Sequence, residues 1–237
     1  LIGNSISIGY TPYVREFLAG KANVYRIPQN GGDTERHVNN MERWLGGHQW
    51  DCISFNVGLH DMKYLLNGQL DKENGTQVRS PAEYKVNLKK EIDILIESGI
   101  QNLIWTNTTF VPEGAEGRFT GDDTVFNNAA LEVLEDYPQI VINDLYTTSK
   151  NHPEEQGEAN VHFSAAGSER LGKQTADLIL SLLERKSIQK QQVGLINNQS
   201  IETLGKTFLF YSSKGIRNIK GELKPEIRDS NQLPSAK

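Results

Sequence analysis

The sequence of 237 residues lacks the features that mark several large classes of protein. Its single cysteine, Cys52, excludes any disulfide within the chain. Cys52 lies in a mainly apolar run, and we expect a buried, unreactive thiol there. No apolar run approaches the roughly 20 residues that a membrane-spanning helix needs. The sequence therefore predicts neither a disulfide-stapled scaffold nor a membrane protein.

An excess of positive charge is also absent, since 25 lysines and arginines stand against 30 aspartates and glutamates. Runs of basic residues reach no further than the pairs Lys89-Lys90 and Arg185-Lys186. A phosphate backbone or an anionic membrane is bound by concentrated positive charge. We therefore expect no nucleic-acid partner and no membrane partner.

The sequence also lacks a set of residues suited to holding a metal ion. His60 and Asp61 are adjacent candidate ligands, but no third ligand lies near them in the sequence. Zinc sites in proteins use at least three protein ligands. We expect neither a metal nor another cofactor.

The length of the chain fits one α/β domain with an appendage better than two domains. We predict a domain at 1–186 and a C-terminal extension or linker at 187–237, where glutamine and asparagine become frequent. The chain opens on Leu1 and shows no signal peptide, so we expect that an earlier segment has been trimmed. Such trimming is compatible with a secreted or periplasmic protein.

Short apolar strands alternate with helical patterns along the predicted domain. We expect strands at 1–2, 22–27, 52–57, 101–106 and 140–142, and helices at 12–18, 34–45, 80–99, 125–134 and 164–186. This alternation is typical of a parallel sheet that helices cover on both faces. The prediction is an α/β fold, a three-layer α/β/α sandwich with a central parallel sheet. Its ligands are expected at the carboxyl ends of the strands.

Residues suited to acyl transfer follow these strands. Ser5 comes directly after the first strand in a turn that begins with Gly3, and His162 precedes the last long helix. A histidine that takes the proton of a serine hydroxyl makes that serine a nucleophile. Gly32 and His60 follow the second and third strands, and each offers an N–H group. Such donors stabilise the negative oxygen that forms when a carbonyl is attacked.

Taken together, these positions resemble the SGNH, or GDSL-type, hydrolase superfamily over roughly residues 1–185. The matching segments are Gly3-Asn4-Ser5, Gly31-Gly32-Asp33-Thr34, Gly58-Leu59-His60-Asp61 and Ala159-Asn160-Val161-His162. The resemblance implies that Ser5 is the nucleophile and His162 the base. It also implies an oxyanion hole made by Gly32, His60 and the amide of Ser5. Each motif is short, and their order along the chain makes the set more specific than any one of them.

Three positions depart from the motifs of this superfamily. Asn4 stands where aspartate is usual, His60 where the usual donor is asparagine, and Ala159 where an aspartate normally orients the catalytic histidine. In a serine protease, neutralising that aspartate lowers turnover about 10⁴-fold. Either a backbone carbonyl or Glu158 orients His162, or the substitution inactivates the protein.

The resemblance implies a serine esterase whose substrate is a small-molecule or glycan ester. A small acyl group, above all acetyl on a carbohydrate, is favoured because the sequence shows no long apolar lid suited to a lipid chain. Two alternatives stay open. One is a catalytically impaired carbohydrate-binding protein on the same fold, which Ala159 favours. The other is a lysophospholipase or thioesterase, which requires an apolar groove.

Four further residues are expected to lie outside the catalytic set or to have an open role: Asn4, Asp61, His37 and Arg118. Asn4 is expected to form a hydrogen bond beneath the serine turn, and Asp61 to brace its loop. His37 is expected to face solvent from a helix. For Arg118 two interpretations stay open, a residue that shapes the mouth of the substrate site and a residue of an ordinary surface loop.

Overall fold

The computed structural model describes residues 1–198, 207–212 and 215–220, with side chains described for residues 1–185. The chain divides into two compact units, Leu1–Arg185 and Lys186–Lys237. Helices and a parallel sheet make up the first unit, so the predicted α/β class is confirmed. The assignment of residues 187–237 as an extension or linker stays a prediction.

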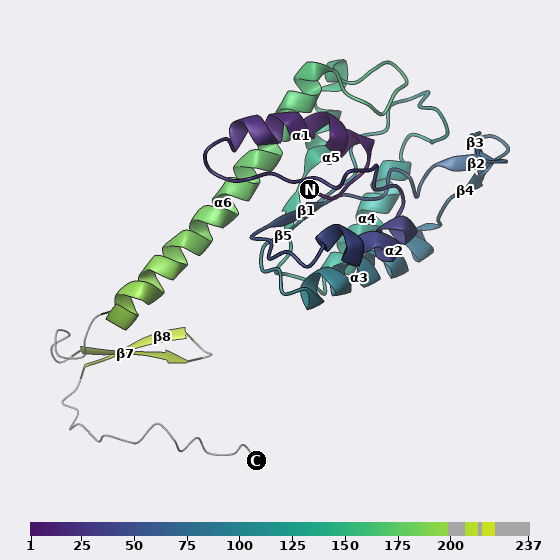
Figure 1. Ribbon diagram of the computed structural model, residues 1–237. Helices are drawn as coiled ribbons and strands as arrows, with labels where there is room; N and C mark the ends of the chain where they lie inside the picture. Colours follow the sequence, from purple (N-terminus) through teal and green to yellow (C-terminus); the bar gives the residue numbers. More distant parts are fainter. Residues whose placement is uncertain (199–206, 213–214, 221–237) are drawn as a thin grey trace, which may run out of the picture. The chain divides into compact units, whose positions relative to one another are not determined.

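The sheet of the first unit has three parallel strands in the order β1-β5-β6 (Figure 1). Their bounds are Ile53–Phe55, Leu103–Thr106 and Val141–Asn143. Every residue of β1 and β5 is buried. Strands buried on both faces read as continuous apolar runs, which is why the sequence pattern located these two.

The two earliest predicted strands are not strands of this sheet. Residues 1–2 contribute only an isolated parallel bridge between Ile2 and Phe55. The strand predicted at 22–27 is wrong, because the segment pairs only with the chain terminus, where the Ile27 amide donates to the Leu1 carbonyl at 3.1 Å. Its Arg26 side chain instead crosses to the serine turn and donates to the carbonyl oxygens of Gly3 and Asn4.

Among the described residues, six α-helices surround or follow the sheet (Figure 1). They are α1 (Ser5–Phe17), α2 (Thr34–Leu45), α3 (Pro81–Glu97), α4 (Asp122–Leu134), α5 (Leu145–Lys150) and α6 (Ala165–Asn198). A short 3₁₀ helix, η1, spans Pro153–Glu155. Five of the α-helices match predicted patterns, although α1 begins earlier than expected, at Ser5 itself. The sequence did not predict α5.

Capping residues fix where several helices begin and end. Ser80 and Glu83 form a capping box at the start of α3, with Pro81 in its first turn. Asp33 caps α2 by accepting from the Arg36 amide, and α2 ends at Gly46, whose φ of 61° is easy only for glycine. The sequence pattern used Ser80, Pro81 and Gly46 among these signals, whereas it placed the cap of α2 one residue too late, at Thr34.

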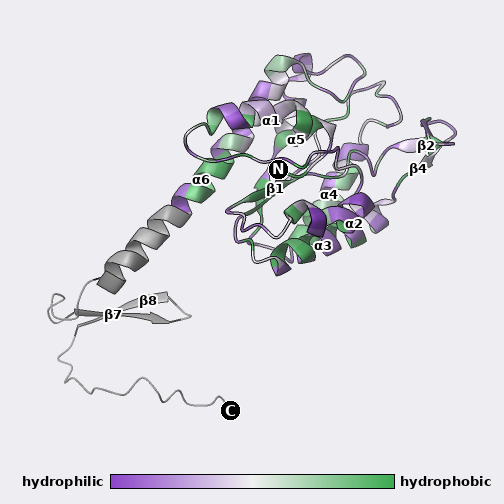
Figure 2. Cartoon of the chain, in the orientation of Figure 1, coloured by the Kyte–Doolittle hydropathy of each residue, from purple (hydrophilic) through white to green (hydrophobic). Residues whose placement is uncertain are grey.

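The core of the first unit lies around the sheet and the inner faces of the helices. Figure 2 shows hydrophobic and hydrophilic residues alternating along α2 and α3, as expected for helices with one buried face. Helix α3 contacts both α2 and α4. Helix α6 packs against α1 at Gly172, where a side-chain carbon would lie 2.7 Å from the Cβ atom of Tyr13.

A small antiparallel sheet lies between β1 and α3 in the sequence. Its strands β2 (Tyr64–Leu66), β3 (Gln69–Leu70) and β4 (Thr76–Gln77) are arranged in the order β3-β2-β4. The tight turn at Asn67-Gly68, with both φ values positive, joins β2 to β3. The sheet is tied to the loop before α4, because the Tyr64 amide donates to the Gly117 carbonyl at 2.8 Å.

The second unit contains an antiparallel hairpin of β7 (Thr207–Ser212) and β8 (Gly215–Lys220). The apolar run at 208–211 lies in β7. Within the described part of the chain, no helix combines the length and apolar character needed to cross a lipid bilayer.

Candidate active site

Ser5 is held at the start of α1 by a network that fixes the preceding turn. The Asn4 side chain caps the helix by accepting from the Ile6 amide at 3.0 Å, as expected for a residue beneath the serine turn. The guanidinium of Arg26 donates to the carbonyl oxygen of Gly3 at 2.9 Å. The backbone that carries the serine hydroxyl is therefore braced from both sides.

The structure brings Ser5 and His162 together. Ser5 Oγ lies 2.8 Å from Nε2 of His162, although 157 residues separate them in the sequence. His162 stands in the loop that leads into α6. The distance lies within the range expected for a serine nucleophile and its base.

Asn160 lies beside His162, in the place where a backbone carbonyl or Glu158 was expected. Its Oδ1 accepts from the His162 backbone amide at 3.0 Å and lies 2.9 Å from Nδ1 of the same residue. A backbone amide can only donate, so the shared Asn160 atom is the oxygen. Nδ1 therefore carries a proton, and the lone pair of Nε2 points to Ser5.

The two orienting groups that we expected for His162 are replaced by this amide. Glu158 is exposed, and no hydrogen bond joins it to His162 among the described residues. Ala159 has a φ of 49°, and its Cβ atom would lie 3.1 Å from a side-chain carbon added to Gly114. The missed signal was the asparagine itself, a side-chain acceptor two residues before the histidine.

Two of the three expected oxyanion donors have free N–H groups among residues 1–185. The Ser5 amide is in the first turn of α1, where helix N–H groups have no partner within the helix. His60 has its Nδ1 3.3 Å from Nζ of Lys63, and an ammonium can only donate. Nδ1 of His60 is therefore the acceptor, and its Nε2 carries the ring proton.

The third expected donor, the amide of Gly32, is engaged in this structure. It donates to Oδ1 of Asn30 at 3.1 Å. Gly32 has a φ of 77°, so the loop needs a glycine there. An oxyanion would have to displace the Asn30 side chain to reach this amide, and the role of Gly32 stays a prediction.

The glycine loop lies directly against the serine turn. The Gly31 amide donates to the Gly3 carbonyl at 2.8 Å, and a side-chain carbon on Gly31 would lie 2.5 Å from Nε2 of His37. The expectation that His37 faces solvent is wrong. Its side chain is fully buried and paired with the equally buried Glu91 at 2.7 Å, because α2 turns this face onto α3.

Burial and nearby cations keep both histidines of the site neutral. Burial lowers the pKa of His60 to about 4, assisted by Lys63 and then Arg118. Burial also lowers the pKa of His162, again with a contribution from Arg118. A neutral His162 can accept a proton, and a neutral His60 still offers one N–H, so both are in the states that acyl transfer requires.

Asp61 braces its loop, as expected. Its carboxylate accepts from the Thr34 amide at 3.0 Å and from the Thr34 hydroxyl at 2.5 Å. Burial raises the pKa of Asp61 to about 7. These two hydrogen bonds connect the loop of His60 to Thr34, the first residue of α2, which directly follows the glycine loop.

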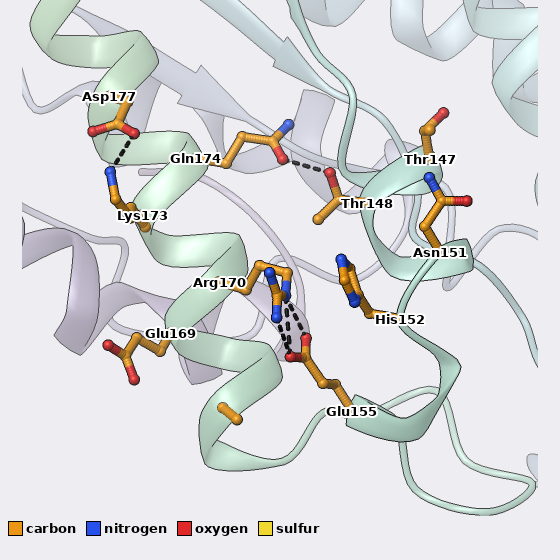
Figure 3. Close-up of a pocket in the computed structure, with 11 residues that line it drawn as sticks. Thr147, Thr148, Asn151, His152, Glu155, Glu169, Arg170, Lys173, Gln174 and Asp177 are labelled. Atoms are coloured by element: carbon orange, nitrogen blue, oxygen red, sulfur yellow. Dashed lines mark hydrogen bonds and ion pairs between the residues drawn. The ribbon is translucent and has the colours of Figure 1, made fainter.

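A separate polar hollow of about 630 Å³ lies between α5, η1 and α6 (Figure 3). Figure 3 shows its charged side chains bound to one another, Arg170 to Glu155 and Lys173 to Asp177. None of the four residues predicted for the active site lines it. Among the described residues, its His152 and Glu155 with the nearby Glu154 form a group spaced for a metal, but Glu155 is already held by Arg170.

Comparison with solved structures identifies the fold. The chain is similar to a lipase/acylhydrolase from Enterococcus faecalis, with 18% identity, a TM-score of 0.59 and coverage of 76% of this chain and 93% of that one. It is also similar to an acetyl xylan esterase, with 17% identity, a TM-score of 0.60 and coverage of 75% and 97%. A third similar structure is a GDSL-like lipase from Bacteroides thetaiotaomicron, with 12% identity, a TM-score of 0.57 and coverage of 78% of this chain and 86% of that one.

The protein therefore has the fold of the SGNH hydrolase superfamily, as the four sequence motifs indicated. No protein-family profile matches the sequence. No curated protein matches it either.

Proposed function

We propose that the protein is a serine hydrolase of carboxylic esters, with Ser5 as nucleophile and His162 as base. The observation that carries this proposal is the chain of hydrogen bonds from Ser5 Oγ through the His162 ring to Asn160. The same order of hydroxyl, imidazole and side-chain acceptor recurs in hydrolases of unrelated folds, including those with asparagine as the third member.

In the proposed reaction, Ser5 Oγ attacks the ester carbonyl carbon while its proton passes to Nε2 of His162. The carbonyl oxygen becomes negative and is held by the Ser5 amide and by Nε2–H of His60. The carbonyl then reforms, and the leaving alcohol takes the proton from Nε2. Water attacks the acyl-enzyme by the same route and releases the acid.

Gly32 is proposed as a third oxyanion donor, available once the Asn30 side chain turns away. This movement breaks one neutral hydrogen bond, which contributes only about 1 kcal/mol to stability. A developing oxyanion is a stronger acceptor than a neutral amide oxygen, so the exchange favours the transition state over the ground state.

Asn160 accounts for how His162 works without the aspartate that Ala159 replaces. The amide oxygen fixes the ring tautomer and orientation, but it is neutral and stabilises the protonated ring less than a carboxylate would. The proposed enzyme therefore keeps the geometry of a triad and gives up part of its electrostatic contribution. This removes the main sequence argument for a catalytically silent binding protein.

The substrate that we propose is a small acyl ester, above all an acetyl ester on a carbohydrate. Similar structures include an acetyl xylan esterase and a carbohydrate esterase of family 3 from Talaromyces cellulolyticus, with TM-scores of 0.60 and 0.59. We propose no nucleic-acid or membrane partner. We further infer that α1 with α6, and α2 with α3 and α4, cover opposite faces of the sheet as a three-layer sandwich, an arrangement that Figure 1 supports.

Hydrolysis of p-nitrophenyl acetate and p-nitrophenyl octanoate, by the protein and by Ser5→Ala, tests the proposal. We expect turnover of the acetate that Ser5→Ala abolishes, and a lower kcat/KM for the octanoate. Absence of Ser5-dependent turnover with either ester would favour the binding protein. A preference for octanoate would favour a lysophospholipase or thioesterase.

A further inference from the structure

Arg118 is a buried cation without a carboxylate partner. Its side chain lies in the loop before α4, and the residue is only 7% exposed. Its Nε donates to the Leu59 carbonyl at 2.8 Å and its Nη1 to the Glu116 carbonyl at 3.2 Å. Among residues 1–185 it forms no ion pair, and its Nη2 makes no hydrogen bond. The expectation of an ordinary surface loop is therefore wrong for this residue.

Arg118 lies close to the loops that carry the two histidines of the candidate site. Its bond to Leu59 places it beside the residue that precedes His60. Its own loop reaches the other side of the site, where Gly114 lies against Ala159. The charge acts on both rings, since Arg118 lowers the pKa of His60 and of His162.

Lys63 places a second cation at the same point. Its Nζ lies 3.3 Å from Nδ1 of His60, and no carboxylate among residues 1–185 forms an ion pair with it. Repulsion from Arg118 contributes to lowering the pKa of Lys63, after burial. Both cations therefore lie close to His60, the proposed oxyanion donor, and close enough to each other to interact.

The acidic groups around this region are already engaged elsewhere. Asp33 caps α2 and lies 3.7 Å from Nη2 of Arg79, and Asp61 is held by Thr34. Glu116 acts on Arg118 only from an exposed position, without an ion pair. These carboxylates moderate the positive potential without pairing with either cation.

Bracing two backbone carbonyls does not require a charge. A neutral glutamine or asparagine amide could donate to the Leu59 or Glu116 carbonyl, whereas burying an unpaired cation carries a large desolvation penalty. An anion that arrives with the substrate would offset this penalty and use the free Nη2 atom. Arginine and lysine together suit a single carboxylate.

We propose that Arg118 and Lys63 recognise a carboxylate on the substrate, so that the preferred ester is an acetylated acidic sugar such as a uronic acid. This inference rests on the proposed function, because it places the carboxylate next to the ester that Ser5 attacks. It extends the substrate class from carbohydrate esters to anionic carbohydrate esters.

The test compares two substrates that differ only at the sixth carbon, mono-acetylated methyl galacturonoside and mono-acetylated methyl galactoside. Release of acetate is measured for both. We expect kcat/KM for the uronate to be at least about tenfold higher at low salt, and the ratio to shrink in about 1 M salt, where charges are screened within about 3 Å. Equal values for the two sugars would overturn the proposal.

Variants separate recognition of the charge from a general loss of activity. Lys63→Met is expected to lower activity on both sugars, since Lys63 also contacts His60, and to reduce the preference for the uronate at least about threefold. Lys72→Met is the matched control, because Lys72 lies over the Phe119 ring at 5.5 Å and contacts neither histidine. A preference that Lys63→Met leaves unchanged would contradict the inference.

Arg118→Met is the stronger variant, and its thermal unfolding is recorded first because Arg118 braces two loops. If this variant does not fold, Lys63→Met carries the test. Equilibrium binding of both sugars to Ser5→Ala, by calorimetry, keeps the test independent of catalysis. If Ser5→Ala binds the uronate more tightly than the galactoside, and if adding Lys63→Met removes this difference, the inference is supported even without turnover. Equal binding, or none, overturns it.

Discussion

The side-chain oxygen of Asn160 accepts hydrogen bonds from both the backbone amide and the ring Nδ1 of His162, at 3.0 and 2.9 Å. The double contact fixes the identity of the acceptor atom, the tautomer of the ring and the direction of its lone pair. One neutral side chain thus supplies the orientation that an aspartate supplies elsewhere, without the charge.

Substitution of Asn160 is expected to change activity in both directions. Asn160→Ala should lower kcat by about 10²-fold, the lower end of what general base catalysis contributes, because the ring loses its fixed orientation. Asn160→Asp should raise kcat by about tenfold, since a carboxylate stabilises the protonated ring by about one pKa unit. Steady-state kinetics with p-nitrophenyl acetate measures both. A lower kcat for Asn160→Asp would contradict this account.

Ala159→Asp is expected to change kcat less than about threefold, although it restores the residue of the superfamily motif. Residue 159 faces Gly114, and Nδ1 of His162 is already bonded to Asn160. The variants Ala159→Asp and Asn160→Asp add the same charge at neighbouring positions. We expect kcat to rise clearly only in Asn160→Asp. If kcat rises in Ala159→Asp as much as in Asn160→Asp or more, the aspartate at position 159 replaces Asn160 as the hydrogen-bond partner of the His162 ring, and this prediction is wrong.

The pH dependence of kcat/KM should reflect the lowered pKa of His162. The ring must be neutral to accept the serine proton, so activity is lost as the pH falls through its pKa. Burial and Arg118 place that pKa below 6.5, the usual value for histidine. We expect half-maximal kcat/KM below pH 6.5, and a shift of this midpoint to higher pH in Asn160→Asp. A midpoint above 6.5 in the unmodified protein would show that another group dominates.

Gly31→Ala is expected to destabilise the protein by about 1–3 kcal/mol and to lower kcat. Its new methyl group would lie 2.5 Å from His37 Nε2 and 2.8 Å from the Gly3 carbonyl oxygen, inside the junction of the two loops. Gly9→Ala is the control, because its methyl group would meet only the Ser168 hydroxyl, at 3.3 Å. Thermal unfolding of both variants gives the comparison, and equal stability would refute the close contact at Gly31.

His60 should make stability depend on pH in a defined window. Its pKa is lowered from 6.5 to about 4 in the folded protein, so the folded state binds fewer protons between these values than the unfolded state. The free energy of unfolding should therefore rise from pH 4 to pH 6.5, by about 2 kcal/mol relative to His60→Asn, which does not titrate. Chemical denaturation at several pH values measures the difference. A constant difference would contradict the burial of this ring.

The sequence predicted the parallel strands and most helices because their signals are local. Strands β1, β5 and β6 are short apolar runs, and α3 has a serine cap followed by proline. The segment at 22–27 has the alternation of a strand, but it pairs only through two hydrogen bonds with Leu1, and pairing is not visible in local periodicity. The hairpin at Asn67-Gly68 was not predicted, although an Asn-Gly pair between two short strands is a strong turn signal.

For the candidate site, motif order pointed to Ser5 and His162, which the structure places 2.8 Å apart. Asn160 and Lys63 were not assigned a role and Arg118 kept two interpretations, because their importance depends on contacts across the fold. Burial of His37 could not be predicted either, because it results from the packing of α2 on α3. The sequence pattern of the helix alone fits a histidine on an exposed face.

Covalent labelling tests the central claim most directly. The protein is incubated with a fluorophosphonate, which reacts with activated serine hydroxyls, and the adduct is located by mass spectrometry of peptides. The account predicts a single adduct on Ser5, absent from Ser5→Ala and formed more slowly by His162→Ala. Labelling of Ser5 at the same rate in His162→Ala, or no labelling of the unmodified protein, would contradict it.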